Sequence, residues 1–122
     1  MPTILVAIND IFFYTKVRDA LLPHGYKLER ARTQDDVGTK TAAEKPDAIV
    51  MDMNEQRLDP FKALTQIKAD PTLAKTPVLV FANHEEVDTW QRAKALGVSK
   101  IVSRNEFSSR TKDLVEELLP RR

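Results

Sequence analysis

The stretch PDAIVMDMNEQRLDP, residues 46–60, decides the fold and raises the question of function. Residues 48–51 are continuously apolar, which is typical of a strand covered on both faces in a parallel sheet. Asp52 follows at the point where this strand leaves the core, and further polar side chains come soon after it. Asp59 and Pro60 then form a typical helix start, because aspartate caps free N–H groups and proline suits the first helical position. The stretch predicts a buried strand, a polar turn and a helix.

Four other segments have strand character. Three of them are short apolar runs, and residues 26–31 alternate between apolar and polar side chains, which indicates a more exposed edge strand. The predicted strands are residues 3–8, 26–31, 48–51, 77–82 and 100–103.

Helical signals lie between and after these strands. In the first helix one apolar face carries Phe13, Val17, Leu21 and Leu22. Capping residues, glycines and prolines indicate where the predicted helices begin and end. The first predicted helix ends at His24-Gly25, the second runs from Thr33 with Asp36 to about Glu44, the third from Asp59-Pro60 to Asp70-Pro71, the fourth from Asn83 with Glu86 to Gly97, and the fifth begins near Asn105.

Length and composition indicate one globular domain. The chain has 122 residues, of which 42% are hydrophobic and 30% charged, and a net charge of +1. We expect one domain over residues 1–119 and a tail or the start of a linker at 120–122. The near-neutral charge argues against a nucleic-acid or membrane surface, and the absence of cysteine excludes thiolate chemistry. With no secretory signal and no long apolar run, we expect a cytoplasmic protein.

Alternating strands and helices predict an α/β fold with parallel strands joined by right-handed crossovers. Five such units commonly form a flavodoxin-like, three-layer (βα)5 structure with strand order 2-1-3-4-5. Ligands bind such sheets at the carboxyl ends of the strands, where strands 1 and 3 diverge. Those ends carry Asn9, Asp10 and Asp52, so we expect these side chains to meet in one pocket.

Several segments together resemble the receiver domain of response regulators in two-component signalling, a family with this strand order. They are ILVA at 4–7, GY at 25–26, PDAIVMD at 46–52, DPTLAKTPVLV at 70–80 and ALGVSKIV at 95–102. The resemblance covers essentially the whole chain. It implies signal transduction by phosphorelay, with a histidine kinase or a downstream signalling protein as partner.

A typical receiver holds Mg²⁺ with an acidic pair after strand 1 and a phosphoryl-accepting aspartate after strand 3. By resemblance, Asp52 is the acceptor, and Asn54 is the neighbour whose backbone carbonyl usually binds the metal. The acidic pair falls on Ile8 and Asn9, or on Asn9 and Asp10 after a shift of one residue. Mg²⁺ needs several oxygen ligands, and at least one carboxylate of the usual acidic pair is missing here, so we expect no resident metal or other cofactor. If Mg²⁺ binds, its ligands are Asp10, Asp52 and Asn54.

The positions that normally respond to phosphorylation are also changed. The hydroxyl residue usual after strand 4 is Ala82, the lysine after strand 5 is Arg104, and the switch aromatic of strand 5 is Ile101. This combination resembles atypical receivers, which keep the fold as a recognition module and lose ordinary phosphoryl switching. Asp52 then has two interpretations: a carboxylate paired with Arg104 and held ionised by it, or a residual phosphoryl acceptor.

Two further sets of residues have competing interpretations. For Asn9 and Asp10 we favour capping of the first helix over metal binding. Trp90 lies on the flank of the fourth helix beside Val87 and Lys94, where a half-buried core position is favoured over an exposed partner anchor. With Ile101, these three residues are the candidate partner-binding face.

The leading hypothesis is an atypical receiver that acts by protein–protein interaction. The alternative is a phosphoryl-accepting receiver that uses Asp52 with an incomplete Mg²⁺ site. The sequence lacks the motifs of two classes of enzyme that share this topology. A flavin-binding fold needs a phosphate loop after strand 1, and NDIFFYTK at 9–16 has no glycine and one threonine. A haloacid-type phosphatase needs Asp-x-Asp, where this chain has Asp52-Met53-Asn54.

Overall fold

The computed structural model describes residues 2–119, apart from the side chains of residues 41, 42 and 44. Five parallel strands form one sheet in the order β2-β1-β3-β4-β5, which confirms the predicted fold class and strand order. Each predicted strand agrees with the structure to within one residue at either end, and β2 lies at an edge as expected. The strands are β1 (Thr3–Ala7), β2 (Lys27–Arg30), β3 (Ala48–Asp52), β4 (Val78–Ala82) and β5 (Lys100–Ser103).

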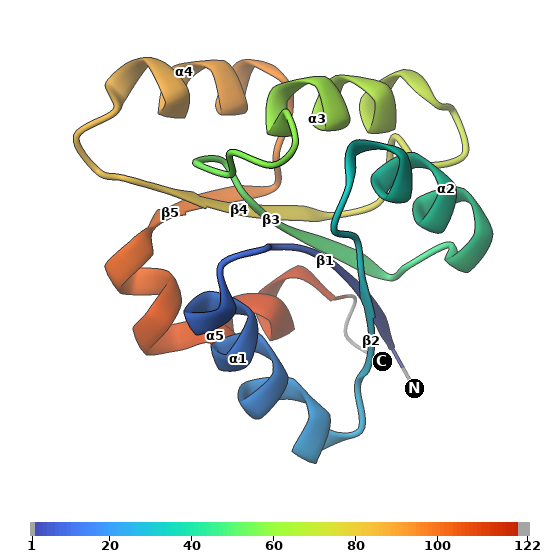
Figure 1. Ribbon diagram of the computed structural model, residues 1–122, viewed down its shortest axis with the longest axis vertical. Coiled ribbons are helices and arrows are strands. Elements are labelled where there is room, and N and C mark those ends of the chain that lie inside the picture. The colour runs from blue at the N-terminus through green and yellow to red at the C-terminus, as the bar shows by residue number, and fades with distance from the viewer. Residues whose placement is uncertain (1, 120–122) are drawn as a thin grey trace.

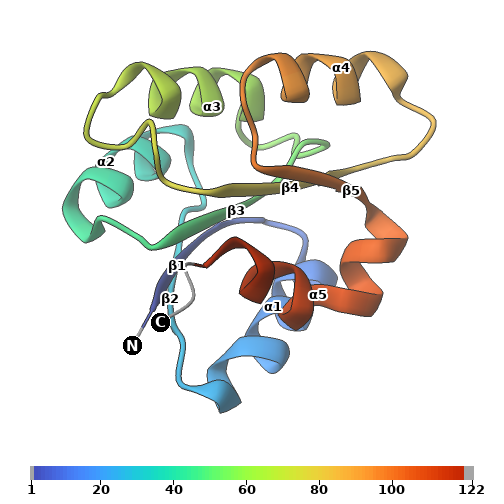
Figure 2. The same ribbon diagram turned by 180° about the vertical axis from the view of Figure 1, so that it is seen from behind.

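Helices cover both faces of this sheet. Helices α1 and α5 lie on one face, and α2, α3 and α4 lie on the other, so the fold has three layers (Figures 1 and 2). The helices are α1 (Ile11–Leu21), α2 (Gln34–Glu44), α3 (Pro60–Ala69), α4 (Val87–Ala95) and α5 (Arg104–Leu118), with a 3-10 turn, η1 (Leu22–His24), after α1.

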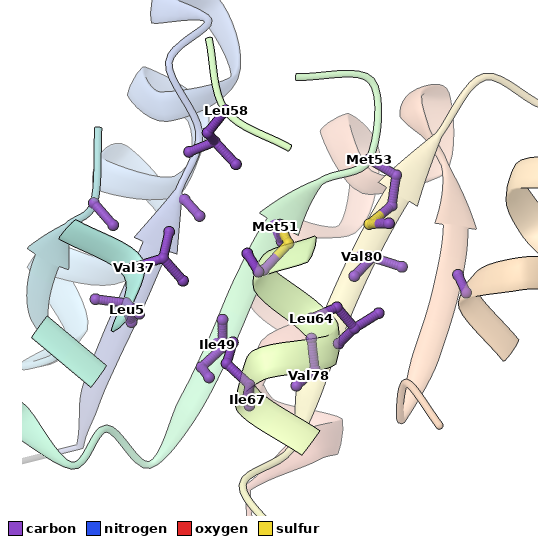
Figure 3. Close-up of a cluster of buried hydrophobic side chains, with 14 of the residues drawn as sticks. Leu5, Val37, Ile49, Met51, Met53, Leu58, Leu64, Ile67, Val78 and Val80 are labelled. Atoms are coloured by element: carbon purple, nitrogen blue, oxygen red, sulfur yellow. The ribbon is translucent and has the colours of Figure 1, made fainter. Parts of the chain in front are cut away.

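The sheet separates two clusters of buried apolar side chains. Along β3, Ile49 and Met51 belong to one cluster and Ala48 and Val50 to the other, because successive strand side chains point to opposite faces. Figure 3 shows the cluster on the α2–α4 face, where strand side chains meet Leu64 of α3. Burial on both faces explains why β1, β3 and β4 are almost continuously apolar in the sequence.

Side-chain caps fix two helix starts as predicted. The carboxylate of Asp59 accepts the N–H of Lys62 at 3.1 Å, and Pro60 is the first residue of α3. The hydroxyl of Thr33 accepts the N–H of Asp36 at 3.1 Å before α2. Each cap satisfies an N–H group that the first helical turn leaves without a partner.

Helix α4 begins three residues later than predicted, because its N-cap position is Glu86 and not Asn83. The segment between β4 and α4 forms a turn, in which the N–H of Glu86 donates to the carbonyl of Asn83 at 3.1 Å. Asn83 does not cap the helix. Its backbone N–H donates to the side chain of Asn54, and its carbonyl accepts from Trp90. The opening predicted at Asn83 is therefore wrong, because these groups bond across the loop.

Two other helix boundaries also differ. Leu22 lies in η1 and is 48% exposed, so it does not belong to the buried face of α1. Helix α5 begins at Arg104, one residue before Asn105 and so near the predicted start, because the hydroxyl of Ser103 caps it by accepting the N–H of Glu106 at 3.0 Å. The earlier start places Arg104 in the first turn of α5, at the carboxyl edge of the sheet.

Candidate functional site

A pocket of about 510 Å³ lies at the carboxyl ends of β1 and β3, where the chain was expected to place its polar residues. It brings together five residues predicted from the sequence to meet. Ile8 does not contribute, because its side chain is fully buried in the core. The pocket is lined by Asn9, Asp10, Asp52, Asn54, Glu55, Gln56, Arg57, Asn83 and Arg104.

Asp52 and Arg104 form an ion pair at the base of this pocket. Nη1 of Arg104 lies 3.0 Å from Oδ1 of Asp52, and only 3% of Asp52 is exposed. Oδ1 also accepts the backbone N–H of Asn54 at 2.8 Å. Nη2 of Arg104 lies 3.8 Å from Oδ2 of Asp10, so one guanidinium faces two carboxylates. The predicted pairing of Arg104 with Asp52 is confirmed.

The guanidinium of Arg104 also lies over two aromatic rings. The central carbon of the Arg104 guanidinium lies 4.3 Å from the ring centre of Phe13 and 5.4 Å from that of Phe81. Phe81 in turn stacks on Phe13, at 4.9 Å, and on Phe107, at 4.3 Å, and the rings of Phe13 and Phe107 lie 6.3 Å apart, so the three rings form one cluster. A cation over an aromatic face is attracted by the negative charge of that face. Sequence analysis missed this support, although helical spacing did place Phe13 on the buried face of α1.

Asp10 caps helix α1, as the sequence analysis favoured. Its Oδ1 accepts the backbone N–H groups of Phe12, at 2.9 Å, and Phe13, at 3.3 Å. Asn9 does not cap this helix, because its side-chain amide donates to the carbonyl of Arg32 at 2.9 Å. The capping interpretation is therefore right for Asp10 and wrong for Asn9.

Residues 4–116 match the family model of the response regulator receiver domain. The chain belongs to this family. Comparison with curated proteins gave no significant match. As a receiver domain, the chain acts in signal transduction, a process in which receivers interact with kinases and other signalling proteins.

Solved structures of response regulators have the same fold as this receiver. A putative response regulator from Chloroflexus aurantiacus has a TM-score of 0.87 at 17% identity, over 98% of both chains. The chemotaxis response regulator CheY4 of Vibrio cholerae gives 0.85 at 19% identity, over 98% of this chain and 99% of that one. The phosphorylated cyanobacterial phytochrome response regulator RcpA gives 0.85 at 20% identity, with the same coverage.

The residues of this receiver do not fit the Mg²⁺ site of its family. Mg²⁺ needs near-octahedral oxygen ligands, yet the guanidinium of Arg104 lies against both carboxylates that would supply them, Asp10 and Asp52. One oxygen of Asp10 already caps α1, and Ile8 offers no ligand. Among the side chains that the structure describes, no group of three or more His, Asp or Glu residues is placed to hold a metal.

The switch positions of the receiver are Ala82, the last residue of β4, and Ile101, which lies within β5. Ala82 is fully buried beside Ser103, and it has no side-chain group that could bond a phosphoryl oxygen. Ile101 pairs with Val80 and is half-buried against the cluster beneath α4. Neither side chain has a polar atom that could form a hydrogen bond.

The candidate partner face of the receiver is partly exposed. Val87 is 59% exposed, and Lys94 is exposed as well. Trp90 is half-buried against the core, as the sequence analysis favoured, and its Nε1 donates to the carbonyl of Asn83 at 3.0 Å. Ile101 lies on the neighbouring strand β5. No helix within residues 2–119 is long and apolar enough to cross a membrane.

Burial raises the pKa of Asp52 above its usual value, and nearby Glu55 raises it further. The backbone N–H of Asn54 and the guanidinium of Arg104 both lower it, but together they offset less than burial adds. Arg104 therefore favours the ionised form, as the sequence analysis expected, while the net shift is upward. Near-complete removal of a carboxylate from water has a larger effect here than one cation.

The raised pKa predicts how stability depends on pH. In the unfolded chain an aspartate titrates at about pH 3.9. Between that value and the raised folded pKa of Asp52, the folded state binds more protons. The contribution of Asp52 is fully present below the unfolded pKa and is lost as the pH rises through the folded pKa. We expect the unfolding free energy of wild type minus that of Asp52→Asn to decrease over this window. Urea unfolding at a series of pH values measures the difference, and an increase with pH would contradict the prediction.

Proposed function

We propose that this receiver is an atypical one, which works as a protein-recognition module and in which phosphoryl switching is weakened or lost. The observation that carries the proposal is the position of Arg104, whose guanidinium lies 3.0 Å from Asp52 and 3.8 Å from Asp10. It supplies a permanent positive charge where the family uses a metal ion. A phosphoryl group arriving at Asp52 would have to displace this charge from the carboxylate.

The proposal includes a protein partner, either a histidine kinase or a downstream signalling protein, bound through α4 and β5. Val87 and Lys94 offer exposed apolar and basic contacts on α4, beside the half-buried Trp90 and Ile101. The domain itself is not an enzyme, works without a cofactor in the cytoplasm and does not bind nucleic acid. The near-neutral charge of +1 supports the last of these statements.

A second function, phosphoryl acceptance by Asp52, is favoured by one observation: Asp52 lines an open pocket at the family's acceptor position. Transfer to a carboxylate depends on neutralising charge on the moving phosphoryl group. With Arg104 held by two carboxylates and two rings, and with no fitting metal site, we expect this transfer to be slow.

Incubation with a small phosphodonor and Mg²⁺ distinguishes the two functions. We expect intact-mass analysis to show no phosphoryl adduct on wild type, since the charge of Arg104 is already paired with Asp52 and Asp10 and the oxygen ligands for Mg²⁺ are incomplete. Asp52→Asn is the matched control, because it removes the acceptor and keeps the shape. An adduct that forms on wild type and is absent from Asp52→Asn would establish the second function.

A further inference from the structure

A continuous chain of hydrogen bonds leads from the Asp52–Arg104 pair to helix α4. Oδ1 of Asp52 accepts the backbone N–H of Asn54 at 2.8 Å. Oδ1 of Asn54 accepts the backbone N–H of Asn83 at 2.8 Å, and the carbonyl of Asn83 accepts Nε1–H of Trp90 at 3.0 Å. The chain therefore joins the start of α5, the end of β3, the loop after β4 and helix α4.

Asn54 is the central link, because its carboxamide uses both of its ends on the same neighbouring segment. While Oδ1 accepts from Asn83, Nδ2 donates to the carboxylate of Glu86, the residue at the N-cap position of α4. Glu86 makes no side-chain cap bond to its own helix. The Asn54 amide thus holds both the beginning and the end of the turn that precedes α4.

Trp90 is the point at which this chain reaches the surface helix. Its ring packs against the core cluster beneath α4, and its indole N–H ends on the same carbonyl that accepts the N–H of Glu86. The indole N–H bond to Asn83 is exposed, so if Asn83 moves, water is the substitute acceptor and the ring loses the fixed contact that orients it. The position of Trp90 therefore depends on where Asn83 is held.

We infer that Asn54 is a positioning residue, which couples the Asp52–Arg104 pair to Trp90 and so sets the geometry of the α4 surface. This route uses backbone groups and one side-chain amide, and it needs neither a hydroxyl at position 82 nor a polar side chain at position 101. The inference rests on the proposed function only in taking α4 as the partner surface. The coupling itself needs no phosphoryl group and no partner.

Because Trp90 is the only tryptophan of the chain, its indole N–H gives a single resonance in a ¹H–¹⁵N NMR spectrum. We expect Asp52→Asn to shift this resonance and to lower the protection of the indole N–H from hydrogen exchange. The expected loss of protection is roughly two- to tenfold, as for the net contribution of one hydrogen bond. In an Asn54→Ala background the same substitution should leave resonance and protection unchanged. Arg104→Lys is a second perturbation of the pair, should Asp52→Asn fail to fold.

Gln34→Ala is the matched control background. Gln34 also bridges two segments with its carboxamide, donating to the carbonyl of Asp59 at 3.2 Å and accepting its N–H at 2.6 Å, but neither bond involves Asp52 or Asn83. In this background, perturbing the pair should still shift the Trp90 resonance. The inference is overturned if perturbing the pair leaves Trp90 unchanged in wild type, or if it shifts Trp90 equally with and without Asn54. Neither result depends on whether Asp52 accepts a phosphoryl group.

Discussion

Replacing Arg104 with alanine should lower the free energy of unfolding by about 2–4 kcal/mol. The substitution leaves the carboxylate of Asp52, which is 3% exposed, without its counter-charge. It also removes the cation that lies over Phe13 and Phe81. Breaking a buried ion pair by removing one partner costs about 3–5 kcal/mol. We expect somewhat less here, because 25% of the Arg104 side chain is exposed to water.

Urea unfolding at neutral pH measures this effect, with Arg110→Ala as the control. Arg110 also forms two ion pairs from α5, with Glu106 at 2.7 Å and Glu117 at 2.8 Å, but all three side chains are at least 40% exposed. Exposed pairs of this kind contribute little to stability. Equal losses for the two variants would show that the Asp52–Arg104 pair behaves as a surface pair and would contradict our account of the pocket.

Phe81→Ala should be at least as damaging, with a loss of about 3–5 kcal/mol in the free energy of unfolding. Phe81 is fully buried and stacks on both Phe13 and Phe107, so its removal leaves a cavity between β4, α1 and α5. The substitution also removes one of the two aromatic rings that lie beneath the guanidinium of Arg104. The functional pocket and the core on this face of the sheet therefore share one aromatic support.

Phe12→Ala provides the comparison for Phe81. Phe12 is adjacent to the stack in sequence, yet 55% of it is exposed. Its loss should change the free energy of unfolding by about 1 kcal/mol or less, since little apolar surface is returned to water. Thermal or urea unfolding of the two variants side by side tests the assignment. A larger loss for Phe12→Ala would mean that the stack does not stabilise the fold as described.

The fold was predictable because its main signals are local. A strand buried on both faces must be continuously apolar, and the runs that end at Ala82 and Asp52 could be located on that basis alone. Asp59 with Pro60 marked a helix start for equally local reasons. Asn83 with Glu86 has a similar pattern, but the helix start predicted from it was wrong. The backbone of Asn83 bonds to Asn54 and Trp90, and the side chain of Glu86 bonds to Asn54, so neither residue forms a side-chain cap.

The site was predictable only in part. Resemblance located Asp52, and the chemistry of a guanidinium beside a carboxylate predicted its pairing with Arg104. The upward shift in the pKa of Asp52 depends on how deeply the carboxylate is buried, which residue types alone do not give. The Asn54 bridge depends on the exact course of two loops that are distant in the sequence. Such contacts appear only when the loops are placed in space.

Our proposal that the guanidinium of Arg104 takes the place of a metal ion beside Asp52 is tested most directly by a Mg²⁺ titration. Trp90 is the only tryptophan, so its fluorescence reports on a single position that is connected by hydrogen bonds to Asp52. Mg²⁺ loses its hydration shell reluctantly and needs several protein oxygens in return. The account predicts no saturable change in Trp90 fluorescence at millimolar Mg²⁺. A saturable change that Asp52→Asn abolishes would contradict it.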